Sequence, residues 1–303
     1  MNRQLAAAAR QQAAADKAAE ARALADALIA ITEIHRQEFP PATRPLAPEA
    51  PPVNVVEIQR RHRKSAKTAT SLFARRARKS ALAQSALDAR QEVAAAEADG
   101  ARLRAAHQSE LDAWWSSLEK CDSDTVLGAL TDAFEDNEAA AAAVGLDGTE
   151  VSLLVVVPSV SAIPERKPTT TQAGNLSLKK LTKTEIADFY KMLVCGHLLV
   201  TLREAFAVAP GLSSARIVAL RASDPDAYGK RRPEVLMTGR CRRDALDEVR
   251  WSEANSARIF NDCLTERLAV QKGATSALQP VPIGDEPQLE ALLAAVDIDE
   301  MLE

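Results

Sequence analysis

Six prolines fall between Pro40 and Pro52, within thirteen residues, and this cluster constrains the fold of the chain more than any other feature. Proline has no backbone N–H and its ring fixes φ, so a segment this rich in proline cannot be helical. We expect residues 40–53 to form an extended, polyproline-like linker. A proline-rich docking ligand is the alternative, and we favour the spacer.

The segment before the linker is rich in alanine, which occurs 14 times in the first 30 residues. Leu24, Leu28, Ile31 and Ile34 fall at spacings that place them on one helical face. Alanine has the highest helix propensity but buries little area. The sequence therefore predicts a helix over residues 1–39 that has little core material.

A second helical segment is predicted over residues 54–120, where no proline occurs. Gly100 is the only glycine in it, and marks either a kink or the turn of a helical hairpin. Unbroken, the segment would be about 100 Å long at about 1.5 Å per residue. A coiled coil is one candidate, but its apolar residues keep no strict heptad spacing. We expect an antiparallel helix pair, or a long helix that associates loosely.

The sequence after residue 120 predicts alternating helices and strands. Val151–Val157 reads VSLLVVV, which is apolar on both faces and typical of an internal strand. Thr182 and Glu185 have the spacing of a capping box, which opens a helix to about Val208. The remaining expected elements are a short helix ending near Gly145, a polar loop over 159–181, strands near 215–222 and 234–241, and a helix over 251–264.

These segments give the chain five parts and one fold class. The parts are an Ala-rich helix (1–39), a Pro-rich linker (40–53), a long basic helical arm (54–120) with a candidate hairpin turn near 100, an α+β globular domain (121–283) and an acidic amphipathic tail (284–303). The fold class is α+β, with long N-terminal helices followed by a small sheet flanked by helices. The tail could pack on its own domain or lie in the groove of a partner.

The net charge of −4 conceals an asymmetry between the two halves of the chain. Residues 1–120 hold 19 Lys and Arg against 14 Asp and Glu, a balance of +5, whereas residues 121–303 hold 19 against 28, a balance of −9. A basic helical half suggests an anionic partner, although the two halves could equally complement each other. The four cysteines have no CxxC spacing, and no long apolar stretch is present. We therefore expect reduced thiols, a cytoplasmic protein and no membrane segment.

The first candidate site is a basic segment with no acidic residue between Glu57 and Asp88. Its nine cations are Arg60, Arg61, Arg63, Lys64, Lys67, Arg75, Arg76, Arg78 and Lys79. On one continuous helix, five of them (60, 64, 67, 75 and 78) would project within about 80° of one another. Such a stripe could follow phosphates with a salt-dependent affinity, and a solvated face is the alternative. Phe73 is the only aromatic residue nearby, so stacking on single-stranded bases is not indicated.

The second candidate site is a basic cluster in the C-terminal half, formed by Lys179, Lys180, Lys230, Arg231, Arg232, Arg240 and Arg242. The two lysines precede a helix N-terminus, which favours anions, and the last two arginines share one face of a strand. The cluster could surround an anion, and surface charge without a ligand is the alternative. Cys195 and His197 diverge by about 200° on a helix and cannot form a catalytic pair. No catalytic residue, metal ligand or cofactor is predicted, because no known motif or metal-ligand spacing occurs.

Several short runs in the C-terminal half resemble an uncharacterised bacterial protein family. The runs are Ile163-Pro164, Gly174-x-Leu176-Ser177-x-Lys179-Lys180, Phe189-Tyr190, Val194-Cys195, and Arg203-Glu204-Ala205-Phe206 with Pro210. Members would share a charged helical N-terminal half and a strand–helix–strand–strand C-terminal domain. The resemblance implies a bacterial source and no known activity.

The leading hypothesis is a non-enzymatic binding or scaffolding protein. Its helical arm would mediate self-association or dock onto an anionic partner, so a protein partner or a second copy is expected. Nucleic-acid binding by the basic helix 60–79 is the first alternative. The second is an enzyme acting on a phosphate-bearing substrate or nucleic acid, with the basic C-terminal cluster as its anion clamp.

Overall fold

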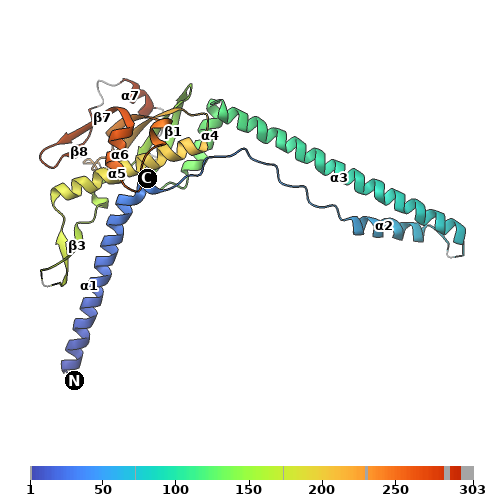
Figure 1. The fold of residues 1–303 in the computed structure, drawn as a ribbon, viewed down its shortest axis with the longest axis horizontal. Coiled ribbons are helices and arrows are strands. Elements are labelled where there is room, and N and C mark those ends of the chain that lie inside the picture. The colour runs from blue at the N-terminus through green and yellow to red at the C-terminus, as the bar shows by residue number, and fades with distance from the viewer. Residues whose placement is uncertain (1, 72, 173, 229–230, 283–286, 295–303) are drawn as a thin grey trace. The chain divides into compact units, whose positions relative to one another are not determined.

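The computed structural model describes residues 2–71, 73–172, 174–228, 231–282 and 287–294 of the chain. The chain divides into two compact units (Figure 1). Unit 1 comprises Met1–Ala42 and Ser117–Glu303, and unit 2 comprises Thr43–Ser116.

Unit 1 is built on a six-stranded sheet flanked by helices, which confirms the predicted α+β fold class. Its helices are α1 (Asn2–Glu33), α4 (Ser123–Phe134), α5 (Lys183–Val208), α6 (Ser256–Cys263) and α7 (Pro287–Ala294), with 3₁₀ turns at Ile34–Arg36, Val160–Ala162 and Arg243–Leu246. Its strands are β1 (Ala141–Asp147), β2 (Glu150–Val156), β3 (Arg166–Thr170), β4 (Leu176–Lys180), β5 (Ser214–Ala222), β6 (Pro233–Arg242), β7 (Leu264–Lys272) and β8 (Ala277–Gln279).

The strand order in the sheet is β1-β2-β5-β6-β7-β8, and β3 pairs with β4 in a separate hairpin. Only β2 and β5 are parallel, because the crossover between them carries α5; the other neighbours are antiparallel. The predicted capping box is present, since the Glu185 backbone N–H donates to Thr182 Oγ1 (3.2 Å) and the Thr182 backbone N–H donates to Glu185 Oε2 (2.9 Å).

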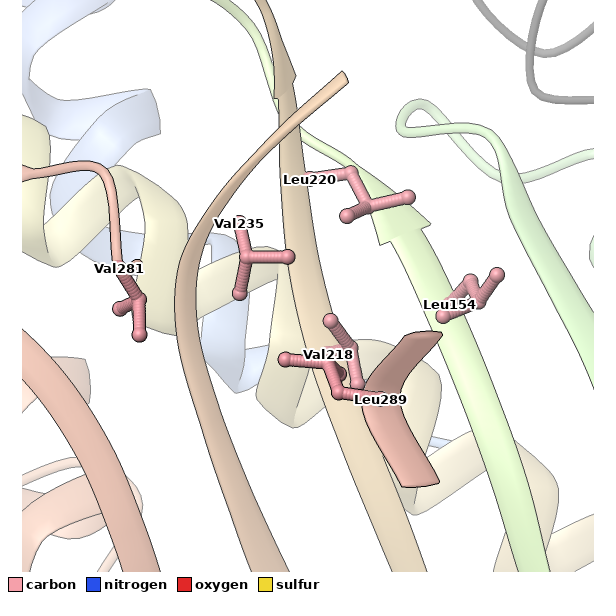
Figure 2. Packing of buried hydrophobic residues seen from close by; sticks show 6 residues of the cluster. All are labelled: Leu154, Val218, Leu220, Val235, Val281 and Leu289. Atoms are coloured by element: carbon pink, nitrogen blue, oxygen red, sulfur yellow. The ribbon is translucent and has the colours of Figure 1, made fainter. Parts of the chain in front are cut away.

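The core lies on both faces of β2 and β5. The helix α5 contacts these strands. Another apolar cluster includes Leu289 of α7 (Figure 2). Its buried members are Leu154, Val218, Leu220, Val235, Val281 and Leu289. The first part of the acidic tail therefore packs on its own sheet, and residues 295–303 lie outside the described residues.

The C-terminal end of α1 is fixed against α5. A Cβ at Gly196 would lie 3.2 Å from the Cβ of Ile34, so the glycine allows close approach of the two segments. His35 is fully buried, and its carbonyl oxygen accepts a hydrogen bond from Arg203 (2.9 Å). The Arg203 guanidinium in turn lies 4.1 Å from the centre of the Trp251 ring.

Three expectations for unit 1 were wrong. The helix α4 ends at Phe134, and Gly145 lies in β1, an edge strand whose alanines have low β-propensity. The expected loop over 159–181 contains the β3–β4 hairpin. The expected helix over 251–264 is limited to α6, and the chain continues into β7. Polar residues are frequent in β7 because most of this strand is exposed to solvent.

Unit 2 consists of α2 (Val55–Thr68), most of α3 (Arg75–Glu119) and the Pro-rich segment before them. The segment forms neither helix nor strand, as its prolines require, but it is not a free linker. The Ala47 N–H donates to Gln108 Oε1 (2.9 Å), and Gln108 Nε2 donates to the Pro45 carbonyl oxygen (3.2 Å). Arg44 also pairs with Asp112 (2.6 Å). We call residues 43–53 the strap.

The geometry of the strap follows from chain dimensions. Six residues separate Arg44 from Ala50, and they run beside the twelve that separate Asp112 from Gly100. An extended chain rises about 3.1 Å per residue and a helix about 1.5 Å, so both stretches span about 18 Å. Polar contacts of the strap therefore recur along α3 at matched positions.

Gly100 is neither a break nor a turn, because α3 is continuous from Arg75 to Glu119. A single glycine costs a long helix only about 1 kcal/mol. Its lack of a side chain makes room for the strap, since an added Cβ would lie 3.3 Å from the Cβ of Ala50. The chain reverses instead at residues 69–74, between α2 and α3 (Figure 1).

Candidate nucleic-acid interface

The helix α2 is held beside α3 by a carboxylate that both Arg61 and His62 contact. His62 Nε2 lies 2.6 Å from Glu92 Oε2, and Arg61 pairs with the other oxygen of the same group. Hydrogen bonds from His62 and Arg61 lower the pKa of Glu92 below its ordinary value. Arg61, one of the candidate anion ligands, therefore serves to join the two helices.

The outer face of α2 carries cations that point to solvent. Arg60 pairs with Glu57 (2.8 Å), whereas Arg63, Lys64 and Lys67 are exposed and have no ion pair within the described residues. Together with neighbouring α2 side chains they line an open depression of about 700 Å³. Its lining residues are Val56, Gln59, Arg60, Arg63, Lys64, Lys67 and Thr68.

The first turns of α3 add a second group of cations. Arg75, Arg76, Arg78 and Lys79 also have no ion pair in the described part of the chain; Arg78 is half-buried and the other three are exposed. We call residues 60–79 the basic end. The sequence argument that placed five of its cations on one helical face was wrong, because the chain reverses at 69–74 and divides them between two helices.

Hydrogen bonds shape the turn between these two groups. Thr70 Oγ1 donates to the Ala66 carbonyl oxygen (2.8 Å), and the Phe73 N–H donates to Ser71 Oγ (3.4 Å). The Ala74 N–H donates to the Ser71 carbonyl oxygen (3.2 Å). The Phe73 side chain is 96% exposed, the largest fraction among the exposed large hydrophobic residues. The sequence did not indicate stacking here, because Phe73 is the only aromatic residue in the basic segment, and its exposure at a turn leaves no periodic signal.

The second basic cluster is dispersed in the structure. Arg240 is opposite Arg216 near the start of β5, whereas Arg232 adjoins the strand pair that ends at Ala222. Six residues of strand, about 20 Å, lie between these two ends. Lys179 and Lys180 are exposed on β4 in the separate hairpin, Arg231 is exposed, and Lys230 lies outside the described residues.

The two arginines at the far end of β6 are neutralised by acids. Arg240 contacts both Glu150 and Glu266, and Arg242 pairs with Asp244 (2.6 Å). They line an open depression of about 730 Å³ whose lining also includes the carboxylates of Asp244, Asp247 and Glu266. An anion bound there would have to displace these carboxylates, so the arrangement does not form a ready anion clamp.

Arg243, beside this cluster, has a structural role that the sequence did not reveal. Its guanidinium donates to the carbonyl oxygens of Phe206, Ala209 and Leu212, each at 2.7 Å. These groups lie at or just beyond the end of α5, where helical carbonyl oxygens lack intrahelical partners. The signal is absent from sequence because the contacts span more than 30 residues.

The buried Cys195 and His197 offer no nucleophile. Burial raises the pKa of Cys195 to about 12, so its thiol stays protonated at neutral pH. Burial also lowers the pKa of His197, which lines a cavity of about 120 Å³ beside Asp136 and Glu138. Within the described residues, no three His, Cys, Asp or Glu side chains are grouped to hold a metal ion.

Among the described residues, no helix has the length and apolar character needed to cross a membrane. Comparisons of the chain with protein-family models, with curated proteins and with solved structures find no match. The resemblance to a bacterial family in the C-terminal half therefore stays a prediction, and the basic end has to be interpreted from its own geometry.

Proposed function

We propose that this protein is a non-enzymatic binding protein whose basic end docks onto the phosphate backbone of nucleic acid. The observation that carries the proposal is the group of seven cations without an ion pair in the described structure: Arg63, Lys64, Lys67, Arg75, Arg76, Arg78 and Lys79. No acidic residue occurs between Ile58 and Leu87 to neutralise them.

Their distribution favours a polyanion over a single small anion. The cations of α2 recur at helical spacing from Arg63 to Lys67, and those of α3 follow across the turn. The two groups flank a reversal of the chain instead of converging on one enclosed pocket. A polymer with a regular series of phosphates can contact both groups, and each contact releases condensed counterions.

The alternative of an enzyme with an anion clamp in unit 1 has less support. Its proposed ligands are distributed between two ends of the sheet and a separate hairpin, and Arg240 and Arg242 already contact carboxylates. Unit 2 also carries a net charge of +5, from 13 basic and 8 acidic residues between Thr43 and Ser116. Long-range attraction of nucleic acid would therefore be directed to unit 2.

Fluorescence anisotropy of the full-length protein with labelled 20-mer duplex DNA, duplex RNA and single strands tests the proposal. If all seven cations contact phosphates of a duplex, log K should fall with log salt concentration with a slope of about −6. Replacing Arg63, Lys64 and Lys67 together by Gln should weaken binding at least about tenfold at 100 mM salt and make the slope shallower by about 3.

The matched control replaces Arg90, Arg102 and Arg104 together by Gln. This variant changes the net charge by the same amount and also alters unit 2, but lies outside the basic end. We expect its affinity to stay within about threefold of that of the parent protein, because this variant weakens only the long-range attraction and removes no proposed phosphate contact. Equal losses in the two variants would refute a localised interface, and absence of binding at 50 mM salt would refute the proposal itself.

A further inference from the structure

Phe73 occupies an unusual position for a phenylalanine in this chain. The other five are buried or half-buried, at positions 39, 134, 189, 206 and 260, whereas Phe73 is 96% exposed. Leaving such a ring in water forgoes the favourable burial that the others obtain. A single exposed apolar side chain is common on protein surfaces, so its meaning depends on what surrounds it.

The surroundings of Phe73 are cationic on both sides along the chain. Lys67 ends the basic face of α2 six residues before it, and Arg75 and Arg76 begin α3 two and three residues after it. The Arg75 N–H also donates to the Phe73 carbonyl oxygen (3.1 Å), so the backbone of Phe73 is bonded to the first residue of α3. The exposed ring therefore lies on the turn that connects the two cationic groups.

We propose that Phe73 stacks on an unpaired base of the nucleic acid that the basic end holds, so that single-stranded or locally unpaired sites are preferred over continuous duplex. This inference rests on the proposed function, because the cations hold the backbone and the ring adds a contact to a base. An aromatic face accepts any base, so the preference is for strand state and not for sequence.

A phosphate chain, and not a lipid surface, is the favoured occupant. Membrane-surface helices bury a continuous apolar face beside their cations. The outer face of α2 offers Arg60, Arg63, Lys64 and Lys67 around only one apolar side chain, that of Val56. One phenyl ring and no apolar helix face suit a single stacking contact better than insertion into acyl chains.

The test compares the full-length protein with F73A, F73W and L103A. Leu103 is a matched control because it is 73% exposed and lies on α3, outside the basic end. The ligands are a 20-nucleotide single strand, the same strand built entirely of abasic sites, a blunt 20-bp duplex, and vesicles of phosphatidylcholine with 30% phosphatidylserine.

We expect F73A to lose about tenfold in affinity for the single strand and less than about threefold for the abasic strand and the duplex. F73W should retain the parent affinity, because indole also stacks, and L103A should behave like the parent protein. The slope of log K against log salt should be unchanged in F73A, since no charge is removed.

The remaining outcomes separate the two proposals. Binding to all nucleic acids with no effect of F73A would overturn the stacking contact and leave the cationic interface intact. Equal losses of F73A on normal and abasic strands would assign Phe73 to the shape of the turn, and also overturn stacking. Phe73-dependent binding to the vesicles alone, without nucleic-acid binding, would refute both proposals.

Discussion

The interactions that stabilise unit 1 differ in kind from those that stabilise unit 2. In unit 1 the strands β2 and β5 are buried on both faces, and residues such as Leu153, Leu154 and Ile217 are completely inaccessible. In unit 2 the described buried side chains are small, namely Ala47, Ser85 and Ala89. Hydrogen bonds and ion pairs join its strap, α2 and α3 instead.

This difference determines what each unit can do with its charges. Acids and bases in unit 1 pair on and around the sheet, as Glu150, Arg240 and Glu266 do. In unit 2 the acids Glu92 and Asp112 hold the strap and α2, and none remains near the turn. Unit 2 therefore uses Glu92 and Asp112 for structure, whereas seven cations of its basic end have no ion pair within the described residues.

The largest expected effect is on the free energy of unfolding, when a leucine is replaced by alanine in unit 1 and, for comparison, in unit 2. Leu154→Ala removes a fully buried side chain from the cluster of Figure 2 and should lower the free energy of unfolding by about 2–5 kcal/mol. Leu103→Ala in unit 2 should change it by less than about 0.5 kcal/mol, because this side chain is mostly exposed. Urea unfolding followed by circular dichroism measures both, and equal effects would contradict the comparison.

A smaller and local effect is expected where the strap meets α3. Gln108→Ala removes hydrogen bonds to Ala47 and Pro45, each worth about 1 kcal/mol. The Ala47 amide should lose about 5- to 30-fold of its protection against hydrogen exchange, while β2 amides keep theirs. Gln91→Ala, at an exposed position of the same helix, is the control. An unchanged Ala47 amide would show that the strap is held by other contacts.

The sequence predicted the parts of this molecule that depend on local patterns. The apolar run of β2, the capping box at Thr182 and the strands β5 and β6 were found because burial or capping imposes a recognisable pattern. Proline content predicted the absence of helix in the strap. Its packing was missed because the polar contacts of Gln108 span about 60 residues.

The candidate site shows the same limit. The cations of the basic end were visible in sequence as a run without acids. Which of them remain unpaired was not, because Arg61 meets Glu92 only after the chain reverses. The position of that reversal was also unpredictable, since residues 69–74 contain neither proline nor glycine. Hydrogen bonds of Ser71 and Thr70 create the turn that exposes Phe73.

The smallest predicted effect concerns acid stability and compares carboxylates of the two units. In unit 1, Lys167 and the Thr182 backbone N–H and hydroxyl lower the pKa of Glu185 to about 2. Because this pKa is lower in the folded protein than in the unfolded chain, the carboxylate stabilises the fold above about pH 4.5, and this contribution is lost as the pH falls toward 2. In unit 2, Glu92 also has a lowered pKa, so α2 should loosen from α3 in acid.

Glu185→Gln keeps a hydrogen-bonding side chain but removes the charge, so it isolates the pH-dependent contribution of Glu185 to the free energy of unfolding. We expect the parent protein to exceed the variant in unfolding free energy by a constant amount above about pH 5, and the difference to shrink between about pH 4.5 and 2. Urea unfolding at a series of pH values measures it, with Glu248→Gln, an exposed position of unit 1, as the control. A difference that stays constant down to pH 2.5 would mean that Lys167 and Thr182 do not hold the ionised carboxylate.

The corresponding Glu92→Gln change in unit 2 should alter hydrogen exchange in α2 and leave β2 unaffected, because the contacts of Glu92 with Arg61 and His62 lie wholly within unit 2.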